Sequence, residues 1–335
     1  MKILLTGGLG YIGSHTAVEC LNAGYDVVIA DDLSNSKENV VQKIFKITNK
    51  KVKFYKANIC NESAIKAIFN ENKDIFAVIH FAGYKAVGES VKLPLKYYDN
   101  NINSTLSLLR VMEQFHCNNL IFSSSATVYS DDNQMPLTEN SKLGPTNPYG
   151  RTKLFNEYII KDYQNANSNF NACILRYFNP IGAHESGIIG EDPNGIPNNL
   201  MPYICKVAIK ELDRLNIFGC DYDTPDGTGI RDYIHVVDLA KGHLLALQKM
   251  QKENVGIAIY NLGTGNGHSV LEIVDTFNKV NGNLVKYEFT SRRDGDVAVC
   301  YTSTIKAKEE LDFNADKTLE DMCKSSYNFN KNNKC

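Results

Sequence analysis

A glycine-rich turn near the N-terminus limits the fold of this chain more than any other feature. The turn spans residues 7–13 (GGLGYIG) and follows the apolar, strand-like run 2–6. Residues 14–23 then show helical spacing, and a second apolar run, 27–30, ends in Asp31. A strand, a glycine turn, a helix and a second strand that ends in an acid predict the start of a doubly wound α/β sheet.

The same turn predicts a dinucleotide site. Gly7, Gly10 and Gly13 let the backbone approach a pyrophosphate, which the N-terminus of the following helix would face. Asp31 can accept a hydrogen bond from a ribose 2′-hydroxyl and would repel a 2′-phosphate, so the pattern favours NAD over NADP. A tight turn without a ligand is the plainer alternative.

Further strand and helix signals alternate through the first half of the chain. Strands are expected at 52–55, 76–81, 119–122 and 172–177, and helices at 61–69, 95–115 and 149–164, with Asn61 as the cap of the first. The predicted fold is a parallel, doubly wound Rossmann sheet. Polar clusters at 82–83, 123–125 and 176–179 all follow strands, so we expect them to line one crevice.

The pattern changes after residue 180. A loop rich in Gly, Pro and Asn (187–202) precedes a helix at 203–212, strands at 215–219 and 230–235, and a helix at 269–280 capped by Ser269. We expect domain 1–180, to which residues 236–264 return, and a smaller α/β substrate domain at 181–235 and 265–330. The segment after Lys324 is mostly Asn, Lys and Ser and is expected to fray.

Tyr149 and Lys153 lie one helical turn apart and form a candidate catalytic pair. A free phenol has a pKa of about 10 and is a poor base at neutral pH. A nearby cation favours the phenolate, and a bound nicotinamide cation would favour it further, which would give a general base for an alcohol proton. Tyrosine and lysine occur at this spacing in many helices by chance, so the pair alone is a weak signal.

Composition excludes several classes of function. The chain has 335 residues, a net charge of −2 and 22% charged residues, which predicts neither nucleic acid nor a membrane surface as a partner. It opens on a strand-like run and has no membrane-length apolar segment, so we expect a cytoplasmic protein. The nine cysteines and seven histidines are scattered, which predicts reduced thiols and no metal site.

Taken together, the motifs resemble the extended short-chain dehydrogenase/reductase family, on G-x-x-G-x-x-G at 7–13, Y-x-x-x-K at 149–153 and the serines between them. Within it, the chain is similar to the UDP-glucose 4-epimerase family over about residues 1–325. The motifs that carry this closer match are HFAG (80–83), KAVGES (85–90), YYDNN (97–101), SSSATVY (123–129), LRYFNP (175–180), PNNLMP (197–202), RDYIH (231–235) and YNLG (260–263).

The resemblance implies interconversion of UDP-glucose and UDP-galactose, in galactose metabolism, with tightly bound NAD. Tyr149 would be the base, Lys153 would lower its pKa and hold the nicotinamide ribose, and Ser125 would bridge the sugar oxygen. Hydride would leave sugar C4, and the 4-keto sugar would rotate and take the hydride back on its other face. The family is usually dimeric through helices around 95–115 and 150–164, so a homodimer is expected.

The resemblance also assigns binding positions. The cofactor positions are Gly7, Gly10, Tyr11, Ile12, Gly13, Asp31, Asn35, Ser36, Asn58, Ile59, Phe81, Ala82, Gly83, Lys85, Asn100, Ser123, Tyr149, Lys153 and Tyr177. The UDP-sugar positions are Lys85, Ser125, Phe178, Asn179, Asn198, Asn199, Leu200, Asn216, Phe218, Arg231, Arg293, Asp296 and Cys300.

Three positions bear on how far the resemblance extends. Asn58 replaces a common Asp near the adenine, although its side-chain oxygen can still accept a hydrogen bond. Ser130 replaces a usual Gly, so the local turn is expected to differ. Cys300 stands where the family has either a bulky Tyr or a small residue, which predicts room for UDP-N-acetylglucosamine and UDP-N-acetylgalactosamine as well.

Other interpretations stay open at this point. Arg231 and Arg293 could be surface ion pairs, residues 123–125 an ordinary loop, and Lys85 a solvated side chain. A 4,6-dehydratase or decarboxylase of the same fold would carry acidic residues where this chain has Ala126 and Thr127. A non-catalytic NAD-binding regulator is a further alternative, although it would have no need of the Ser125, Tyr149 and Lys153 set.

Overall fold

The computed structural model describes residues 1–335 except 194, 196, 198, 294, 334 and 335. The chain forms two compact units. Unit 1 comprises Met1–Asp131, Ser141–Tyr177 and Ala240–Tyr260, and unit 2 comprises Asp132–Asn140, Phe178–Leu239 and Asn261–Cys335. Among the helices that can be described, none is both long enough and apolar enough to cross a membrane.

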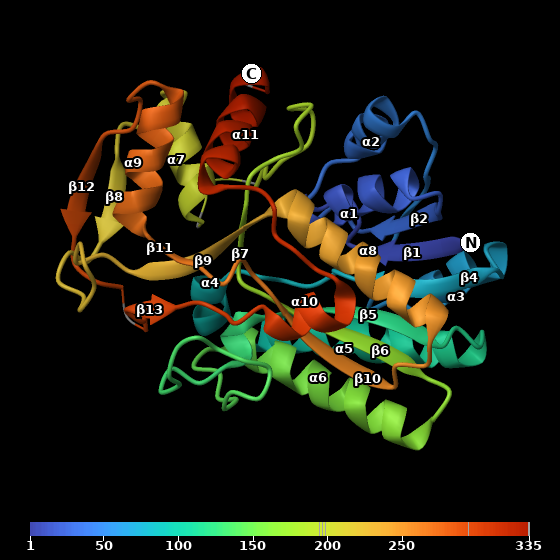
Figure 1. Ribbon diagram of the computed structural model, residues 1–335. Coiled ribbons are helices and arrows are strands. Elements are labelled where there is room, and N and C mark those ends of the chain that lie inside the picture. Colours follow the sequence, from blue (N-terminus) through green and yellow to red (C-terminus); the bar gives the residue numbers. More distant parts are fainter. Residues whose placement is uncertain (194, 196, 198, 294, 334–335) are drawn as a thin grey trace. The chain divides into compact units, whose positions relative to one another are not determined.

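Unit 1 is built on a seven-stranded sheet with the order β10-β6-β5-β4-β1-β2-β3 (Figure 1). The pairings from β1 to β6 are parallel, and the strand order reverses between β1 and β4. The predicted doubly wound sheet is therefore confirmed, and β10 joins it from late in the chain. The strands are β1 (Lys2–Thr6), β2 (Asp26–Asp31), β3 (Lys53–Lys56), β4 (Ile75–His80), β5 (Asn119–Ser125), β6 (Asn171–Tyr177) and β10 (Ile257–Leu262).

Helices cover both faces of this sheet: Figure 1 shows α1 and α8 on one side and α5 and α6 on the other. Asn61 caps α3 by accepting from the Ala64 amide, as predicted, and Asn147 caps α6 by accepting from the Gly150 amide. The helices are α1 (Tyr11–Asn22), α2 (Val40–Thr48), α3 (Glu62–Glu71), α4 (Val87–Lys92), α5 (Pro94–Gln114), α6 (Pro148–Ala166) and α8 (Val236–Lys252), with a 3₁₀ turn at Ala126–Val128.

The sheet is buried on both faces, as expected for parallel strands between two helical layers. One continuous apolar cluster joins the strands to α3, α5 and α6. Burial of these side chains is the main stabilising term for the unit, at about 25 cal/mol for each Å² of apolar surface removed from water. Fully or almost fully buried members include Leu4, Val78, Leu108, Met112, Leu120, Phe122, Ile160 and Phe170.

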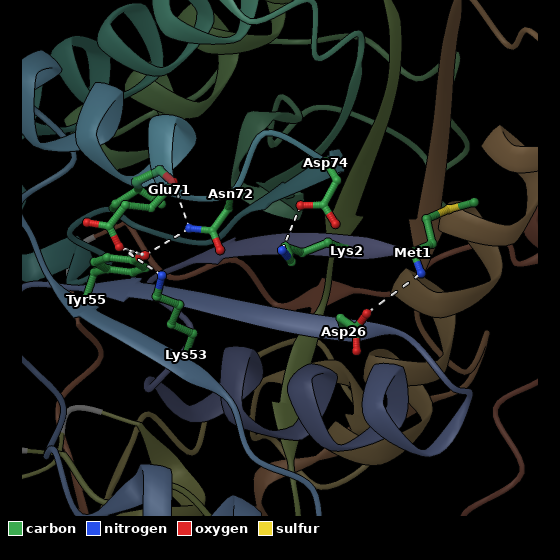
Figure 2. Close-up of polar contacts among 9 residues, drawn as sticks. Met1, Lys2, Asp26, Lys53, Tyr55, Glu71, Asn72 and Asp74 are labelled. Atoms are coloured by element: carbon green, nitrogen blue, oxygen red, sulfur yellow. Dashed lines mark hydrogen bonds and ion pairs between the residues drawn. The ribbon is translucent and has the colours of Figure 1, made fainter.

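Charged pairs link the amino ends of the strands at the surface (Figure 2). Lys2, at the start of β1, pairs with Asp74 just before β4 at 2.7 Å. Glu71, at the end of α3, accepts from both Lys53 (2.8 Å) and Tyr55 (2.7 Å) of the edge strand β3. Exposed pairs of this kind each contribute about 1 kcal/mol or less. Surface ion pairs thus hold the amino-terminal side of the sheet, whereas the glycine turn, Asp31 and Phe81 lie at the opposite, carboxyl ends of the strands.

The described residues of unit 2 form two small sheets and include the helices α7, α9, α10 and α11. Strand β9 pairs with β7, β11 and β13, and β8 pairs with β12 in a separate two-stranded sheet. A core that includes Ile204, Cys205, Ile273, Phe277 and Met322 joins them. The elements are β7 (Asn179–Ile181), α7 (Leu200–Ala208), β8 (Leu215–Phe218), β9 (Ile230–His235), β11 (Gly267–Ser269), α9 (Val270–Asn281), β12 (Tyr287–Thr290), β13 (Val299–Cys300), α10 (Ile305–Leu311) and α11 (Leu319–Asn332).

The C-terminal segment is helical, so the prediction that it frays after residue 324 is wrong. Thr318 and Asp321 form a reciprocal capping box that starts α11. The helix packs against α7 and α9 (Figure 1). Its side chains Met322 and Phe329 are buried. Burial of this apolar stripe outweighs the weak helix propensity of the many Asn and Ser residues around it.

Candidate active site

The glycine turn lies at the point where the strand order of the sheet reverses. Gly7 has a φ of +68°, and a Cβ added there would lie 2.8 Å from the amide nitrogen of Ala82. A Cβ added at Gly13 would lie 2.5 Å from the carbonyl oxygen of Gly7. Side chains are therefore excluded from both positions, and the backbone of the turn stays accessible at its outer side.

The N-terminus of α1 is suited to an anionic ligand. Gly10 is the cap residue and supplies no side-chain hydrogen bond, and the first turn contains no acidic residue. The first amides of a helix have no intrahelical partners and carry a partial positive charge. Tyr11 and Ile12, two predicted cofactor residues, are the first residues of this helix. The arrangement fits the pyrophosphate of a dinucleotide.

Asp31 ends β2 and is buried. One carboxylate oxygen accepts from the Leu9 amide at 3.0 Å, and the other accepts from the Leu33 amide at 2.9 Å and the Ser36 hydroxyl at 2.7 Å. A carboxylate has about four acceptor positions, so roughly one remains for a ligand hydroxyl. Asn35 is exposed in the same loop.

Asn101 is a site residue that the sequence analysis missed. Its side chain accepts from the Tyr84 amide at 2.8 Å and donates to the Tyr84 carbonyl oxygen at 3.0 Å and to the Thr152 hydroxyl at 3.0 Å. It therefore holds the loop that carries Ala82, Gly83 and the exposed Lys85 against α6, directly before Lys153. The neighbouring Asn100, which was predicted, donates to the Asn101 side chain at 3.0 Å.

The two departures from the family pattern have local explanations. The side-chain oxygen of Asn58 accepts from the Cys60 amide at 2.8 Å and has a second lone pair available. Its neighbour Ile59 is buried. Ser130 donates its amide to the Lys142 carbonyl oxygen at 2.9 Å, and its backbone does not lie in the left-handed region. The freedom of a glycine is therefore not required there.

Lys153 points toward the carboxyl end of β5. Its Nζ donates to the Ser123 carbonyl oxygen at 2.6 Å and lies 5.9 Å from the centroid of the Tyr149 ring. Ser125 caps the 3₁₀ turn that follows β5, where its hydroxyl accepts from the Thr127 amide at 3.2 Å and the Thr127 hydroxyl at 3.0 Å. Unit 1 thus brings Ser123, Ser125, Tyr149 and Lys153 together.

Burial controls the protonation of the catalytic pair. Desolvation raises the pKa of Tyr149 to about 12, and a hydrogen bond with Ser125 acts in the opposite direction. Desolvation lowers the pKa of Lys153 to about 8, and the carboxylate of Glu157 opposes this shift. Lys153 is not among the groups that shift the pKa of Tyr149 in this structure, so the lowering of this pKa by Lys153 stays a prediction.

A buried ion pair lies one helical turn beyond Lys153. Arg176 (1% exposed) donates two hydrogen bonds to Glu157 (0% exposed), at 3.0 Å and 2.7 Å. Ser124 donates to the same carboxylate at 2.6 Å, and Arg176 also donates to the Tyr129 hydroxyl at 2.9 Å. The sequence pattern predicted Arg176 in a polar cluster after a strand, but it did not predict Glu157 on α6 as its partner.

Unit 2 brings two predicted arginines onto one carboxylate. Arg231 lies 3.7 Å from one oxygen of Asp296, and Arg293 donates to the other at 2.9 Å. The Arg293 guanidinium lies 4.9 Å from the centroid of the Phe218 ring, and Cys300 pairs with Arg231 across β9 and β13. Two guanidinium groups and one carboxylate leave one net positive charge, which suits a diphosphate.

The remaining predicted sugar-nucleotide residues also lie in unit 2. Phe178 is buried, Asn179 begins β7, and Leu200 begins α7 directly after its cap residue Asn199. The Asn216 side-chain oxygen is buried without a hydrogen-bond partner, so it is a free acceptor. Asn198 lies outside the described residues. Across the part of the chain that is described, no group of His, Cys, Asp and Glu could hold a metal ion.

Comparison with known proteins identifies relatives over the whole chain. A model of the NAD dependent epimerase/dehydratase family matches residues 3–263. The UDP-glucose 4-epimerase of Bacillus subtilis is 54% identical over 333 residues, covering 99% of this chain and 98% of the relative. The human UDP-glucose 4-epimerase is 50% identical over 339 residues, covering 99% and 97%.

Solved structures agree with the fold. The UDP-glucose 4-epimerase of Bifidobacterium longum in complex with NAD+ and UDP has a TM-score of 0.96 and 49% identity, covering 99% of each chain. The UDP-Glc/GlcNAc 4-epimerase of Campylobacter jejuni has a TM-score of 0.85 and 36% identity, again covering 99% of each chain.

Proposed function

Because this chain belongs to the NAD dependent epimerase/dehydratase family, we propose that it interconverts UDP-glucose and UDP-galactose in galactose metabolism. The observation that carries the proposal is its likeness, over nearly its full length, to relatives that bear the name of this activity. The site supports it, since unit 1 provides a base for an alcohol proton and unit 2 provides paired cations for a diphosphate.

The residues of unit 1 fit NAD. We assign the pyrophosphate to the glycine turn and the N-terminus of α1, and a ribose to the free acceptor position of Asp31. Lys153 would hold the nicotinamide ribose. When bound, NAD would supply the two-electron acceptor at sugar C4 and a positively charged ring that favours the Tyr149 phenolate.

The base chemistry follows from the pKa of Tyr149. At a pKa of about 12, only about one phenol in 100,000 is ionised at pH 7, so the reaction depends on positive charge close to the phenol oxygen. Tyr149 would then take the proton of the 4-hydroxyl while Ser125 holds that oxygen. Carbon 4 loses its hydrogen with two electrons, which leaves a 4-keto sugar. The reverse transfers to the other face give the epimer, and Tyr149 returns its proton.

Unit 2 would hold the nucleotide. Arg231 and Arg293 are proposed to bind the diphosphate with charge-assisted hydrogen bonds, in place of part of their contact with Asp296. Phe218 is 40% exposed and offers an aromatic face. Phe178, Asn179, Asn198, Asn199, Leu200 and Asn216 complete the proposed set.

We propose that N-acetylated UDP-sugars are also substrates. Cys300 is a small, half-buried residue beside Arg231, and the similar Campylobacter jejuni enzyme bears the name of a UDP-Glc/GlcNAc 4-epimerase. Cys300→Tyr should abolish conversion of UDP-N-acetylgalactosamine and spare that of UDP-galactose. Loss of both activities would count against this explanation.

We also propose a cytoplasmic homodimer. The eight cysteines in the described residues are free, as is usual in a reducing compartment. On α5 and α6, the side chains of Leu95, Phe155 and Tyr158 are 80%, 42% and 47% exposed, and exposed apolar side chains of this kind are typical of an interface. Phe155→Glu should convert the dimer to a monomer in light scattering; an unchanged mass, or a monomeric wild-type protein, would contradict this.

The proposed reaction is tested by incubating the purified protein with UDP-galactose and following the products by NMR. UDP-glucose is expected at equilibrium, and Tyr149→Phe should lower kcat by about 10²–10⁴-fold. A 4-keto-6-deoxy product would identify a dehydratase instead. Binding of NAD without turnover would support the regulator.

A further inference from the structure

His243 contacts two predicted cofactor residues although no sequence motif singled it out. It lies on α8 within unit 1 and is fully buried. Its Nε2 forms a short hydrogen bond with the Tyr177 hydroxyl. Its ring lies 4.9 Å from that of Phe81 and 5.1 Å from that of Tyr177, measured between centroids. Phe81 follows β4 and Tyr177 ends β6, so His243 connects the carboxyl ends of two strands.

We assign Tyr177 as the donor of this hydrogen bond and the neutral imidazole of His243 as its acceptor. Burial raises the pKa of Tyr177 well above its usual value, so the phenol stays protonated. A side-chain hydrogen bond with Ser123 acts against this rise in the pKa of Tyr177. The single proton of the phenol can be donated to Nε2 of His243 when the ring proton of this histidine lies on Nδ1.

The same contacts lead back to the catalytic pair. Ser123 accepts from Lys153 through its carbonyl oxygen at 2.6 Å and bonds Tyr177 through its hydroxyl. Tyr149 is close enough to Tyr177 to raise the pKa of Tyr177 electrostatically. A rotation of the Tyr177 ring would therefore disturb Ser123, beside the ammonium group of Lys153.

We propose that His243 is a positioning residue: by accepting a hydrogen bond from the Tyr177 hydroxyl and packing on Phe81, it fixes the wall against which the reactive end of the cofactor binds. The inference rests on the proposed function and extends it to a residue on α8. The plainer alternative is a core histidine that contributes only packing and stability.

A double-mutant cycle separates these possibilities. His243→Phe keeps a ring of similar size and removes the acceptor, and Tyr177→Phe removes the donor. If both substitutions act by freeing the Tyr177 ring, each single variant should have a kcat about tenfold below that of wild type and a KM within about twofold of it. The kcat of the double variant should then be no lower than that of either single variant. His243→Gln, which keeps an acceptor, should recover part of the loss.

NAD retention gives a readout that does not depend on turnover. The His243→Phe and Tyr177→Phe proteins should release NAD about tenfold faster than wild type, as followed by the NAD content after gel filtration. His235→Phe is the matched control, because His235 is also buried and contacts the Ser325 hydroxyl, at 3.1 Å in unit 2. It should lower the melting temperature and leave the NAD content unchanged.

Three results would overturn the proposal: additive losses in the double variant, wild-type kcat and NAD retention in His243→Phe, or an equal loss of NAD in the control. If His243→Phe does not fold, His243→Gln decides: a functional hydrogen bond predicts a partial loss of kcat in the wild-type background and no further loss in the Tyr177→Phe background. A wild-type protein that binds NAD but does not convert UDP-galactose would refute the proposed reaction instead.

Discussion

Replacing Glu157 with Gln tests how the buried ion pair supports the site. The change keeps the shape of the side chain and removes its charge, which leaves the guanidinium of Arg176 buried at 1% exposure without a counter-ion. Breaking a buried pair in this way costs about 3–5 kcal/mol. At about 2–4 °C for each kcal/mol, the melting temperature should fall by roughly 6–20 °C.

The same substitution should change the pH dependence of the reaction. Glu157 holds the pKa of Lys153 up against desolvation, so its loss should lower that pKa below about 8. A protonated Lys153 is required beside Tyr149, and therefore the decline of kcat on the alkaline side should begin at lower pH than in wild type. The pH profile of UDP-galactose conversion measures this shift.

Arg176→Met supplies the control for the Glu157→Gln experiment. In the double variant no unpaired buried charge remains, so it should melt at a higher temperature than Glu157→Gln alone. Melting curves from circular dichroism measure all four proteins. Additive losses, or a Glu157→Gln protein that melts within about 2 °C of wild type, would refute this view of the pair.

Other substitutions test individual parts of the structure. Burial lowers the pKa of His80 to about 3, so below pH 6.5 the unfolded chain binds a proton that the folded protein excludes. The free energy of unfolding should therefore drop by about 3 kcal/mol between pH 7 and pH 4.5. In urea titrations, His80→Gln should remove this pH-dependent loss. Gly13→Ala would place a Cβ 2.5 Å from a backbone oxygen and should abolish NAD retention. Gly88→Ala, where the added Cβ meets no other atom within 4 Å, should retain NAD as the wild type does. Equal NAD retention by the two variants would contradict the packing argument. Arg293→Met should raise the KM for UDP-galactose about 10–100-fold, as expected for a lost charge-assisted contact. Arg292→Met is the control and should leave this KM unchanged, because Arg292 pairs with the exposed carboxylate of Asp221 outside the proposed site.

The elements with strong local signals were predictable from the sequence. The turn at 7–13, the buried strands and the caps at Asn61 and Ser269 depend on neighbouring residues, and the structure confirms them. Residues 236–264 were also expected to return to the first domain, and β10 from this segment lies in the main sheet. In each case the local preference and the final packing favour the same structure.

Features created by contacts distant in the sequence were not predictable. Strands β7, β11 and β13 are two or three residues long and exist because they pair with β9. Helix α11 forms because its apolar stripe is buried, against the preference of its Asn-rich sequence. Asn101 and Glu157 act through partners 17 to 51 residues away, and no spacing rule connects those positions.

The most direct test of the proposed reaction uses UDP-galactose carrying deuterium at C4, in unlabelled water, with no NAD added. A closed cycle, in which the hydrogen removed from C4 returns to the same carbon, predicts UDP-glucose that retains the deuterium at C4 and protein that keeps its NAD. Loss of the label to solvent, or no conversion even when NAD is supplied, would contradict it.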